Sequence, residues 1–125
     1  MGRGNLEIGR IGEKAAIKFL KKRGYRILAT NFRTVFGELD AVARYGSVII
    51  FVEIKTRSTD SLGPGYLSVT RAKQRHIIKN ALLFLKMRRL KDVDWRVDVV
   101  SVRLDVALKV RNIELIENAV EDYHV

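Results

Sequence analysis

The sequence predicts an α/β domain in which a mixed β-sheet of about five strands is flanked by helices. Two segments show helical periodicity, and the segments between and after them have the apolar character of strands. The second helix separates two strand candidates and is long enough for a right-handed parallel crossover, whereas a tight hairpin before it adds antiparallel pairs. The chain has 125 residues, so we expect residues 1–125 to form a single domain.

The first helix is expected from about Leu6 to Arg23, with Gly24 as its C-terminal cap. Its apolar residues recur at helical spacing and form one stripe, made of Ile8, Ile11, Ala15 and Phe19. Basic residues lie on the opposite side: Arg10, Lys14, Lys18 and Lys21. Glu13 lies at the flank of the apolar stripe, where a side chain can reach past the edge of the core.

Three strand candidates follow at residues 25–32, 38–44 and 48–56. The run Tyr45-Gly46-Ser47 joins the last two as a tight hairpin. The only proline, Pro64, lies between two glycines and indicates a loop.

The second helix is expected from Arg71 to about Leu90, with Ser68 or Thr70 as its N-cap. Two more strands are expected at about residues 95–104 and 110–116. The predicted order of elements is therefore α-β-β-β-α-β-β.

The charge of the chain indicates a polyanionic partner. There are 24 Lys and Arg residues against 14 Asp and Glu, which gives a net charge of +10 and an isoelectric point near 10.2. All the basic residues precede Asn112, and four of the acidic residues follow it. Nucleic acid is favoured as the partner over a basic surface that is only solvated.

Composition also excludes several kinds of site. The chain has no cysteine, so a disulfide framework, a thiolate zinc site and a cysteine nucleophile are excluded, and two histidines are too few for a histidine-rich metal site. No signal-peptide core is visible at the N-terminus. No apolar run is longer than that of residues 48–52, which is far shorter than the ~20 residues that span a bilayer. We therefore expect a cytoplasmic protein with no membrane partner.

Charged residues end an otherwise apolar strand and suggest a catalytic or metal-binding site. Glu53 and Lys55 are two residues apart and so share a face of the sheet, and Asp40 on the partner strand can approach Glu53 across the hairpin. Two adjacent carboxylates repel each other when ionised, and a divalent cation relieves the repulsion. Mg²⁺, or Mn²⁺ in its place, prefers such oxygen ligands and keeps waters for a substrate and a nucleophile.

This set predicts phosphodiester hydrolysis. Asp40 and Glu53 would hold the metal, which polarises the phosphate and lowers the pKa of a bound water. Lys55 would orient that water or stabilise charge on the phosphate, and Glu13 would complete the metal shell directly or through a water. Each residue taken singly is as well explained by a solvated charge or an exposed ion pair worth at most about 1 kcal/mol. The set as a whole favours a catalytic site.

At these residues the sequence resembles a known group of nucleases. The runs Gly37-Glu38-Leu39-Asp40 and Phe51-Val52-Glu53-Ile54-Lys55-Thr56-Arg57 resemble the split D…E-x-K motif of the restriction-endonuclease-like superfamily. Over nearly its full length the chain resembles the YraN family of small bacterial proteins, which are similar to archaeal Holliday junction resolvases. Further stretches carry this resemblance: Gly12-Glu13-x-Ala15-Ala16, Phe19-Leu20, Asn31-Phe32-Arg33, Gly63, Lys73, Arg96-Val97-Asp98-Val99-Val100 and Asn118-Ala119.

The resemblance implies a restriction-endonuclease-like α/β core. It also implies that Asp40, Glu53 and Lys55 form the active-site triad and that Glu13 is the carboxylate from the helix. The chain matches the motif at all four positions.

Three further residues are candidates for nucleic-acid binding. Arg57 follows Lys55 and would touch a phosphate or simply end the strand in water. Lys73 and Gln74 open the second helix, whose N-terminal end favours anions. For Lys73, a phosphate contact and a solvated lysine are equally well supported.

Two acidic residues, Glu38 and Asp98, are not expected to take part in metal binding or catalysis. Glu38 shares a strand face with Asp40, and a supporting or solvent-facing role is expected for it rather than metal binding. Arg96 and Asp98 share a strand face, and an internal ion pair is expected there rather than catalysis.

The sequence thus predicts an Mg²⁺-dependent endonuclease that acts on structured or branched DNA. The alternative is a nucleic-acid-binding module on a nuclease scaffold without catalytic turnover. The basic surface suits both, but a pure binder gains little from acids aimed at phosphate. A basic scaffold within a protein or ribosome-associated complex is a third, less favoured interpretation. Cutting both strands of a junction would require a symmetric homodimer, for which the sequence holds no specific signal.

Overall fold

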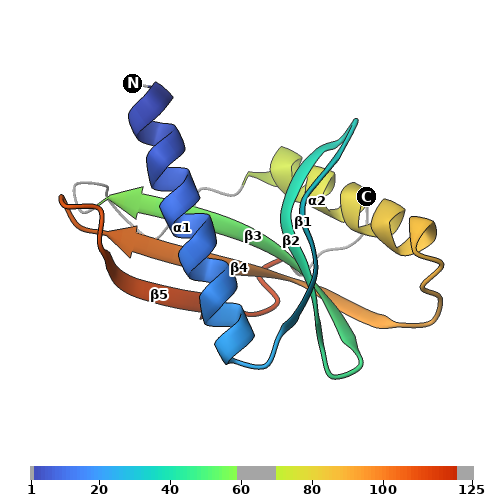
Figure 1. Cartoon of the computed structure of the whole chain (residues 1–125). Coiled ribbons are helices and arrows are strands. Elements are labelled where there is room, and N and C mark those ends of the chain that lie inside the picture. Colours follow the sequence, from blue (N-terminus) through green and yellow to red (C-terminus); the bar gives the residue numbers. More distant parts are fainter. Residues whose placement is uncertain (1, 59–69, 121–125) are drawn as a thin grey trace.

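The computed structural model describes residues 2–58 and 70–120. The elements follow the predicted order, and most of their ends lie within a few residues of the prediction (Figure 1). In chain order they are α1 (Gly2–Lys22), β1 (Arg26–Thr34), β2 (Gly37–Tyr45), β3 (Val48–Ser58), α2 (Arg71–Met87), β4 (Asp94–Leu104) and β5 (Val110–Ile116). The predicted loop around Pro64 and the alternative cap Ser68 lie outside the described residues.

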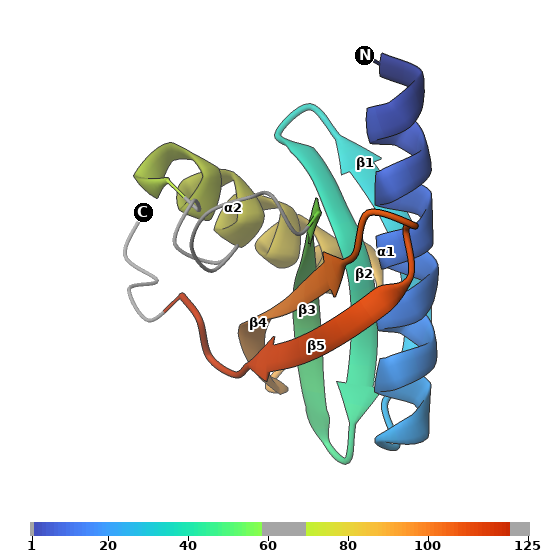
Figure 2. The same cartoon turned by 90° about the vertical axis from the view of Figure 1, so that its left-hand side faces the viewer.

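The five strands form one mixed sheet in the order β1-β2-β3-β4-β5. The pairs β1–β2, β2–β3 and β4–β5 are antiparallel, and β3–β4 is parallel. The chain crosses from β3 to β4 through α2, as the parallel pairing requires. Helix α1 covers one face of the sheet and α2 the other (Figure 2). This α/β arrangement confirms the predicted fold class and is consistent with a restriction-endonuclease-like fold.

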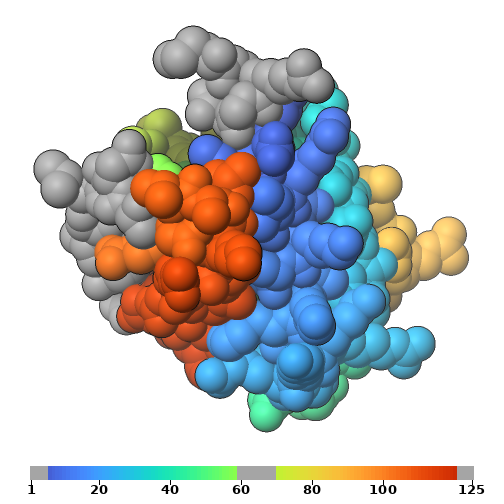
Figure 3. Space-filling view, turned by 60° about the vertical axis from the view of Figure 1, so that its left-hand side comes forward, coloured from blue at the N-terminus to red at the C-terminus, as the bar shows by residue number. Residues whose placement is uncertain are grey.

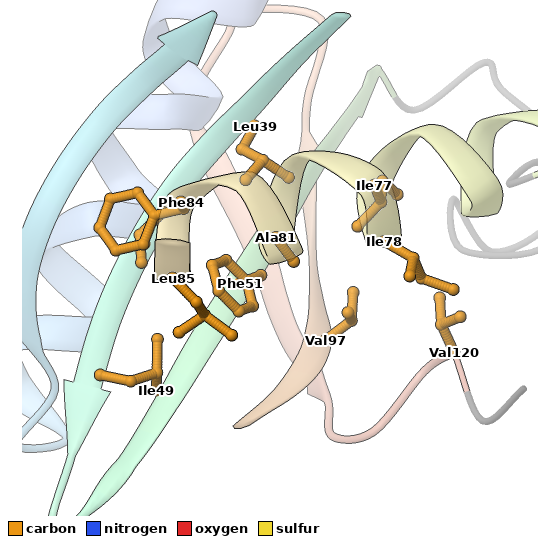
Figure 4. Packing of buried hydrophobic residues seen from close by; sticks show 11 residues of the cluster. Leu39, Ile49, Phe51, Ile77, Ile78, Ala81, Phe84, Leu85, Val97 and Val120 are labelled. Atoms are coloured by element: carbon orange, nitrogen blue, oxygen red, sulfur yellow. The ribbon is translucent and has the colours of Figure 1, made fainter. Parts of the chain in front are cut away.

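Strand β3 separates two hydrophobic clusters. Ile49 and Phe51 point toward α2, where Phe51 meets Phe84 in an edge-to-face contact with ring centroids 5.9 Å apart (Figure 4). Ile50 and Val52 point the other way, into the cluster beneath α1. Successive side chains of a strand alternate between its two faces, so a strand buried on both sides is apolar throughout.

Both helices end at identifiable caps. After α1, Gly24 has a φ of 90°, and the N–H of Tyr25 donates to the Leu20 carbonyl at 3.0 Å, which confirms the predicted glycine cap. At the start of α2, the hydroxyl of Thr70 accepts from the Lys73 N–H at 3.1 Å, as predicted. Helix α2 ends at Met87, before the predicted Leu90, whose N–H closes the helix end by donating to the Leu85 carbonyl at 2.9 Å.

Helix α1 lies close against β3. A Cβ at Gly12 would collide with the Thr56 side chain, so any other residue at this crossing would force Thr56 or α1 to move. Because Thr56 directly follows Lys55 on β3, the crossing fixes α1 against the strand that carries Glu53 and Lys55. Within residues 2–58 and 70–120, no helix combines the length and apolar character needed to cross a membrane.

The sheet divides between β2 and β3. Their pairing runs from Tyr45 and Val48 to Ala41 and Val52, and beyond that point β2 pairs only with β1 and β3 only with β4. The β1–β2 hairpin curves away from β3 at this point (Figure 1). We call this division, just beyond Ala41 and Val52, the fork.

Candidate active site

Asp40 lies on β2 directly beyond Ala41, the last residue of β2 that pairs with β3. Its Oδ2 accepts a hydrogen bond of 2.7 Å from the Ile54 N–H. The backbone ladder between the two strands has ended at Ala41, so a side-chain carboxylate takes the place of a backbone carbonyl as the acceptor. This hydrogen bond directs the Asp40 carboxylate toward β3.

Glu53 projects from the α2 side of β3, because it continues the alternation of Ile49 and Phe51. Its side chain is buried, with 6% of its surface exposed. Glu53 Oε2 finds no hydrogen-bond donor within the described part of the chain, and the Lys73 Nζ lies 3.4 Å from it as an ion pair. The first turn of α2 thus supplies the cation that faces Glu53.

Asp40 and Glu53 do not readily carry two negative charges at once. Burial raises the pKa of Asp40 to about 8, and the hydrogen bond to Glu53 and the charge of Glu53 act in the same direction. The Ile54 N–H and the Lys73 charge oppose this shift and do not overcome it. At neutral pH, without a bound cation, Asp40 therefore tends to keep a proton beside the Glu53 carboxylate.

Two amines complete what we call the fork cluster, which consists of Asp40, Glu53, Lys55 and Lys73. Burial lowers the pKa of Lys55, and the neighbouring Lys73 lowers it further. Burial alone would lower the pKa of Lys73, but its interactions with Lys55 and with the Glu53 carboxylate raise it overall. The structure therefore brings together the three residues of the predicted triad and adds Lys73 from α2.

The raised pKa of Asp40 predicts a pH dependence of stability. Between the ordinary value of 3.8 and about 8, the folded chain binds a proton at Asp40 that the unfolded chain has lost. Stability from this group is therefore lost as pH rises through that window. We expect Asp40→Asn to gain unfolding free energy relative to the parent between pH 4.5 and 8, measured by urea unfolding without divalent metal. A difference that stays constant with pH would contradict this prediction.

Glu13 is not brought into the fork cluster. It lies on α1, which packs on the opposite face of the sheet from Glu53 and α2, and its Oε1 accepts a 3.0 Å hydrogen bond from the Asn31 Nδ2. Among the described residues, no three His, Asp or Glu side chains group closely enough to hold a metal ion. A metal at Asp40 and Glu53 would thus need waters or substrate oxygens for its other ligands, which Mg²⁺ commonly accepts.

The other predicted contacts flank the cluster. Arg57 follows Lys55 on the same face of β3 and lies opposite Arg103 of β4. Gln74 lies in the first turn of α2, where its N–H donates to the Thr70 carbonyl at 2.9 Å. Both residues are half-buried, and their phosphate contacts stay predictions.

The surface of α1 holds a basic hollow, which we call the α1 groove. It has a volume of about 750 Å³. Its lining residues are Arg10, Glu13, Lys14, Ile17, Lys18, Lys21, Lys22 and Asn31. Figure 3 shows α1 crossing this face between β5 and the β1–β2 hairpin. Asn31 lies on β1 between the pairs Thr30–Ala41 and Phe32–Leu39, and thus beside Asp40 in the sheet, so the groove reaches the strand next to the fork.

Sequence reasoning missed a second polar position on α2. Asn80 is buried, and its Oδ1 accepts a hydrogen bond from the Thr34 hydroxyl, which in turn accepts from the Phe36 N–H at 3.0 Å. These contacts tie the tip of the β1–β2 hairpin to α2. Next to them lies a cavity of about 260 Å³ that Glu38, Lys73 and His76 help to line. An asparagine in the apolar stripe of α2 is the only sequence signal for this contact.

Comparisons with known proteins agree on one family. Residues 12–102 match the sequence profile described as "Uncharacterised protein family UPF0102". A UPF0102 protein of Caldicellulosiruptor saccharolyticus is 43% identical over 113 residues, which are 90% of this chain and 96% of that protein. One of Syntrophus aciditrophicus is 44% identical over 94% of this chain and 91% of its own length. One of Dictyoglomus turgidum is 39% identical over 92% and 98%.

Proposed function

The chain belongs to the UPF0102 family, the group to which the YraN resemblance pointed, and from that premise and the fork cluster we propose that it is a metal-dependent endonuclease. Its substrate would be structured or branched DNA. The observation that carries the proposal is the meeting of Asp40 and Glu53 beside two amines. Two carboxylates held together in a buried place cost free energy, which a binding or catalytic task accounts for.

The chemistry of the donor set fits a divalent cation. Glu53 Oε2 is buried and lacks a hydrogen-bond donor among the described residues, and Asp40 has a carboxylate oxygen that the Ile54 N–H does not use. Asp40 and Glu53 would hold Mg²⁺ or Mn²⁺, and the bound ion would polarise a phosphate and acidify a water. Whether Glu13 contributes through a water stays a prediction.

Residues of the chain would orient the metal ligand, position the water and bind the phosphate backbone. The Ile54 N–H fixes the orientation of the Asp40 carboxylate. Lys55, whose pKa is lowered by burial and by Lys73, can orient a water or stabilise charge on the scissile phosphate. Lys73 and the opening turn of α2 would face the phosphate backbone, as would Arg57 and Gln74.

Cleavage of defined substrates tests the proposal. The purified protein is incubated with linear, nicked and four-way-junction DNA in Mg²⁺, in Mn²⁺ or in chelator. We expect metal-dependent cleavage, with the junction cut faster than linear DNA, and no cleavage in chelator. Tight binding to these DNAs without cleavage in either metal would overturn the proposed endonuclease activity and favour a nucleic-acid-binding module. Paired cuts on opposite strands would in addition indicate a dimer.

The α1 groove predicts where a DNA backbone binds. We expect the double variant Lys14→Gln/Lys18→Gln to bind DNA more weakly, because each lysine would neutralise a phosphate and release a counterion. The slope of log affinity against log salt concentration should fall by about two. Fluorescence anisotropy in chelator measures both without cleavage.

A matched control uses two lysines, one in the last turn of α2 and one just beyond its end. Lys86→Gln/Lys91→Gln removes the same charge from exposed positions outside the groove and should leave the slope nearly unchanged. Equal losses of slope in the two double variants would assign the affinity to net charge instead of the groove.

A further inference from the structure

Lys73 occupies an unusual position between a buried carboxylate and solvent. Its Nζ lies 3.4 Å from Glu53 Oε2, yet 43% of the Lys73 side chain is exposed, against 6% for Glu53. Its backbone is fixed, because the Lys73 N–H donates to the Thr70 cap at 3.1 Å. The ammonium is thus held at the mouth of the fork by a flexible stem on a rigid helix end.

The contact between Lys73 and Glu53 is loose for a buried charge. No hydrogen bond to Glu53 Oε2 is made within the described residues, so the ammonium faces this oxygen as a charge without a well-formed hydrogen bond. Buried carboxylate oxygens are usually fully hydrogen-bonded or bound to a metal. The Glu53 oxygen is therefore balanced in charge and still open to a closer ligand.

We propose that Lys73 is a resident cation that holds the metal position beside Glu53 and leaves it when a divalent cation binds. This inference rests on the proposed metal-dependent function and concerns how that site is loaded. Two cations cannot both lie against the same buried oxygen, because their mutual repulsion is weakly screened there. The ammonium and the metal are therefore alternative occupants.

The structure offers Lys73 a place to go. The cavity of about 260 Å³ between α2 and the hairpin tip is lined by Lys73 itself and by Glu38, whose carboxylate also pairs with Arg33 at 3.1 Å. A rotation of the lysine stem moves the ammonium away from Glu53 without disturbing the apolar side of α2, which is formed by other residues. Once released, the ammonium is available to a substrate phosphate.

This exchange couples metal affinity to Lys73. Because the two occupants exclude each other, removal of the ammonium must strengthen metal binding. Coupling free energies between sites commonly correspond to about 5- to 150-fold in affinity. A residue that only stabilises the fold would not have this effect, since its loss leaves metal affinity unchanged or lower.

Calorimetric titration with Mn²⁺ alone tests the inference. We expect Lys73→Met, which keeps the length of the stem and removes the charge, to bind Mn²⁺ at least about fivefold more tightly than the parent. Lys86→Met removes the same charge from an exposed position on the last turn of α2 and should bind like the parent. Equal or weaker binding by Lys73→Met would overturn the inference.

An NMR titration keeps the test decisive. In the parent, ¹³C-methylated lysines are observed by NMR, with Lys73 assigned by its loss in Lys73→Arg. Its signal should shift on addition of Mg²⁺ in the parent and not in Glu53→Gln. A Lys73 signal that ignores Mg²⁺ while the parent binds the ion overturns the inference even if Lys73→Met does not fold. Absence of metal binding in both the parent and a folded Lys73→Met would overturn the proposed function as well.

Discussion

Replacement of Glu53 by glutamine is expected to reduce junction cleavage by at least about a hundredfold. The substitution keeps the shape of the side chain and removes the negative charge that would hold the cation opposite Asp40. DNA affinity should be unchanged or higher, because an acid facing the phosphate backbone has been neutralised. Single-turnover cleavage rates in Mg²⁺ and anisotropy in chelator measure the two effects separately, and Asp40→Asn should behave in the same way.

Glu114→Gln is the matched control for that experiment. Glu114 is exposed on β5, outside the fork cluster, so the same change of chemistry should leave the cleavage rate at the parent level. Cleavage by Glu53→Gln at the rate of the parent would identify a contaminating nuclease and remove the support for a catalytic role. Loss of DNA binding together with cleavage would instead indicate that Glu53 is needed for the fold.

The fold was predictable from the sequence wherever local rules decide. Gly24 ends α1 as expected because the left-handed backbone there suits glycine, and the unbroken apolar run of β3 indicated a strand covered on both faces. The end of α2 was placed too late, since Arg88 and Arg89 are good helix formers by propensity. Arg89 takes a positive φ of 54° in the structure, which lets Leu90 fold back on Leu85.

The site was predictable only in part. The spacing of Glu53 and Lys55 fixed their common face, and the hairpin made the approach of Asp40 plausible. The hydrogen bond from the Ile54 N–H to Asp40 depends on the end of the β2–β3 ladder, which no residue pattern marks. The hydrogen bond between Glu13 and Asn31 depends on the packing of α1 on the sheet, which the sequence does not specify, and a role for Glu13 at the metal stays a prediction. Lys73 was a candidate for a phosphate contact on equal terms with a solvated lysine, and its contact with Glu53 follows from the position of α2.

The predicted ion pair of Arg96 and Asp98 is confirmed and lies apart from the fork cluster. Asp98 is fully buried, and its Oδ1 accepts from the Arg96 Nε at 3.0 Å and from the Asn118 N–H at 2.9 Å. Arg96 also donates to the Tyr25 hydroxyl at 3.0 Å. The network therefore joins β4 to the start of β1 and to the chain after β5. Burial raises the pKa of Asp98 in spite of these contacts.

Asp98→Ala is accordingly expected to lower the free energy of unfolding by about 3 kcal/mol, because it removes the buried carboxylate that accepts from the Arg96 Nε and from the Asn118 N–H. For a domain of this size the melting temperature should fall by roughly 10 °C. Asp98→Asn keeps an acceptor and loses only the charge, so its loss should be smaller, and the exposed Glu114→Ala should stay within about 0.5 kcal/mol of the parent. Urea unfolding of the three variants measures these three losses of unfolding free energy and ranks them. A loss for Asp98→Ala no greater than that for Glu114→Ala would mean that the pair adds nothing beyond what well-packed apolar residues provide, as is known for some buried ion pairs.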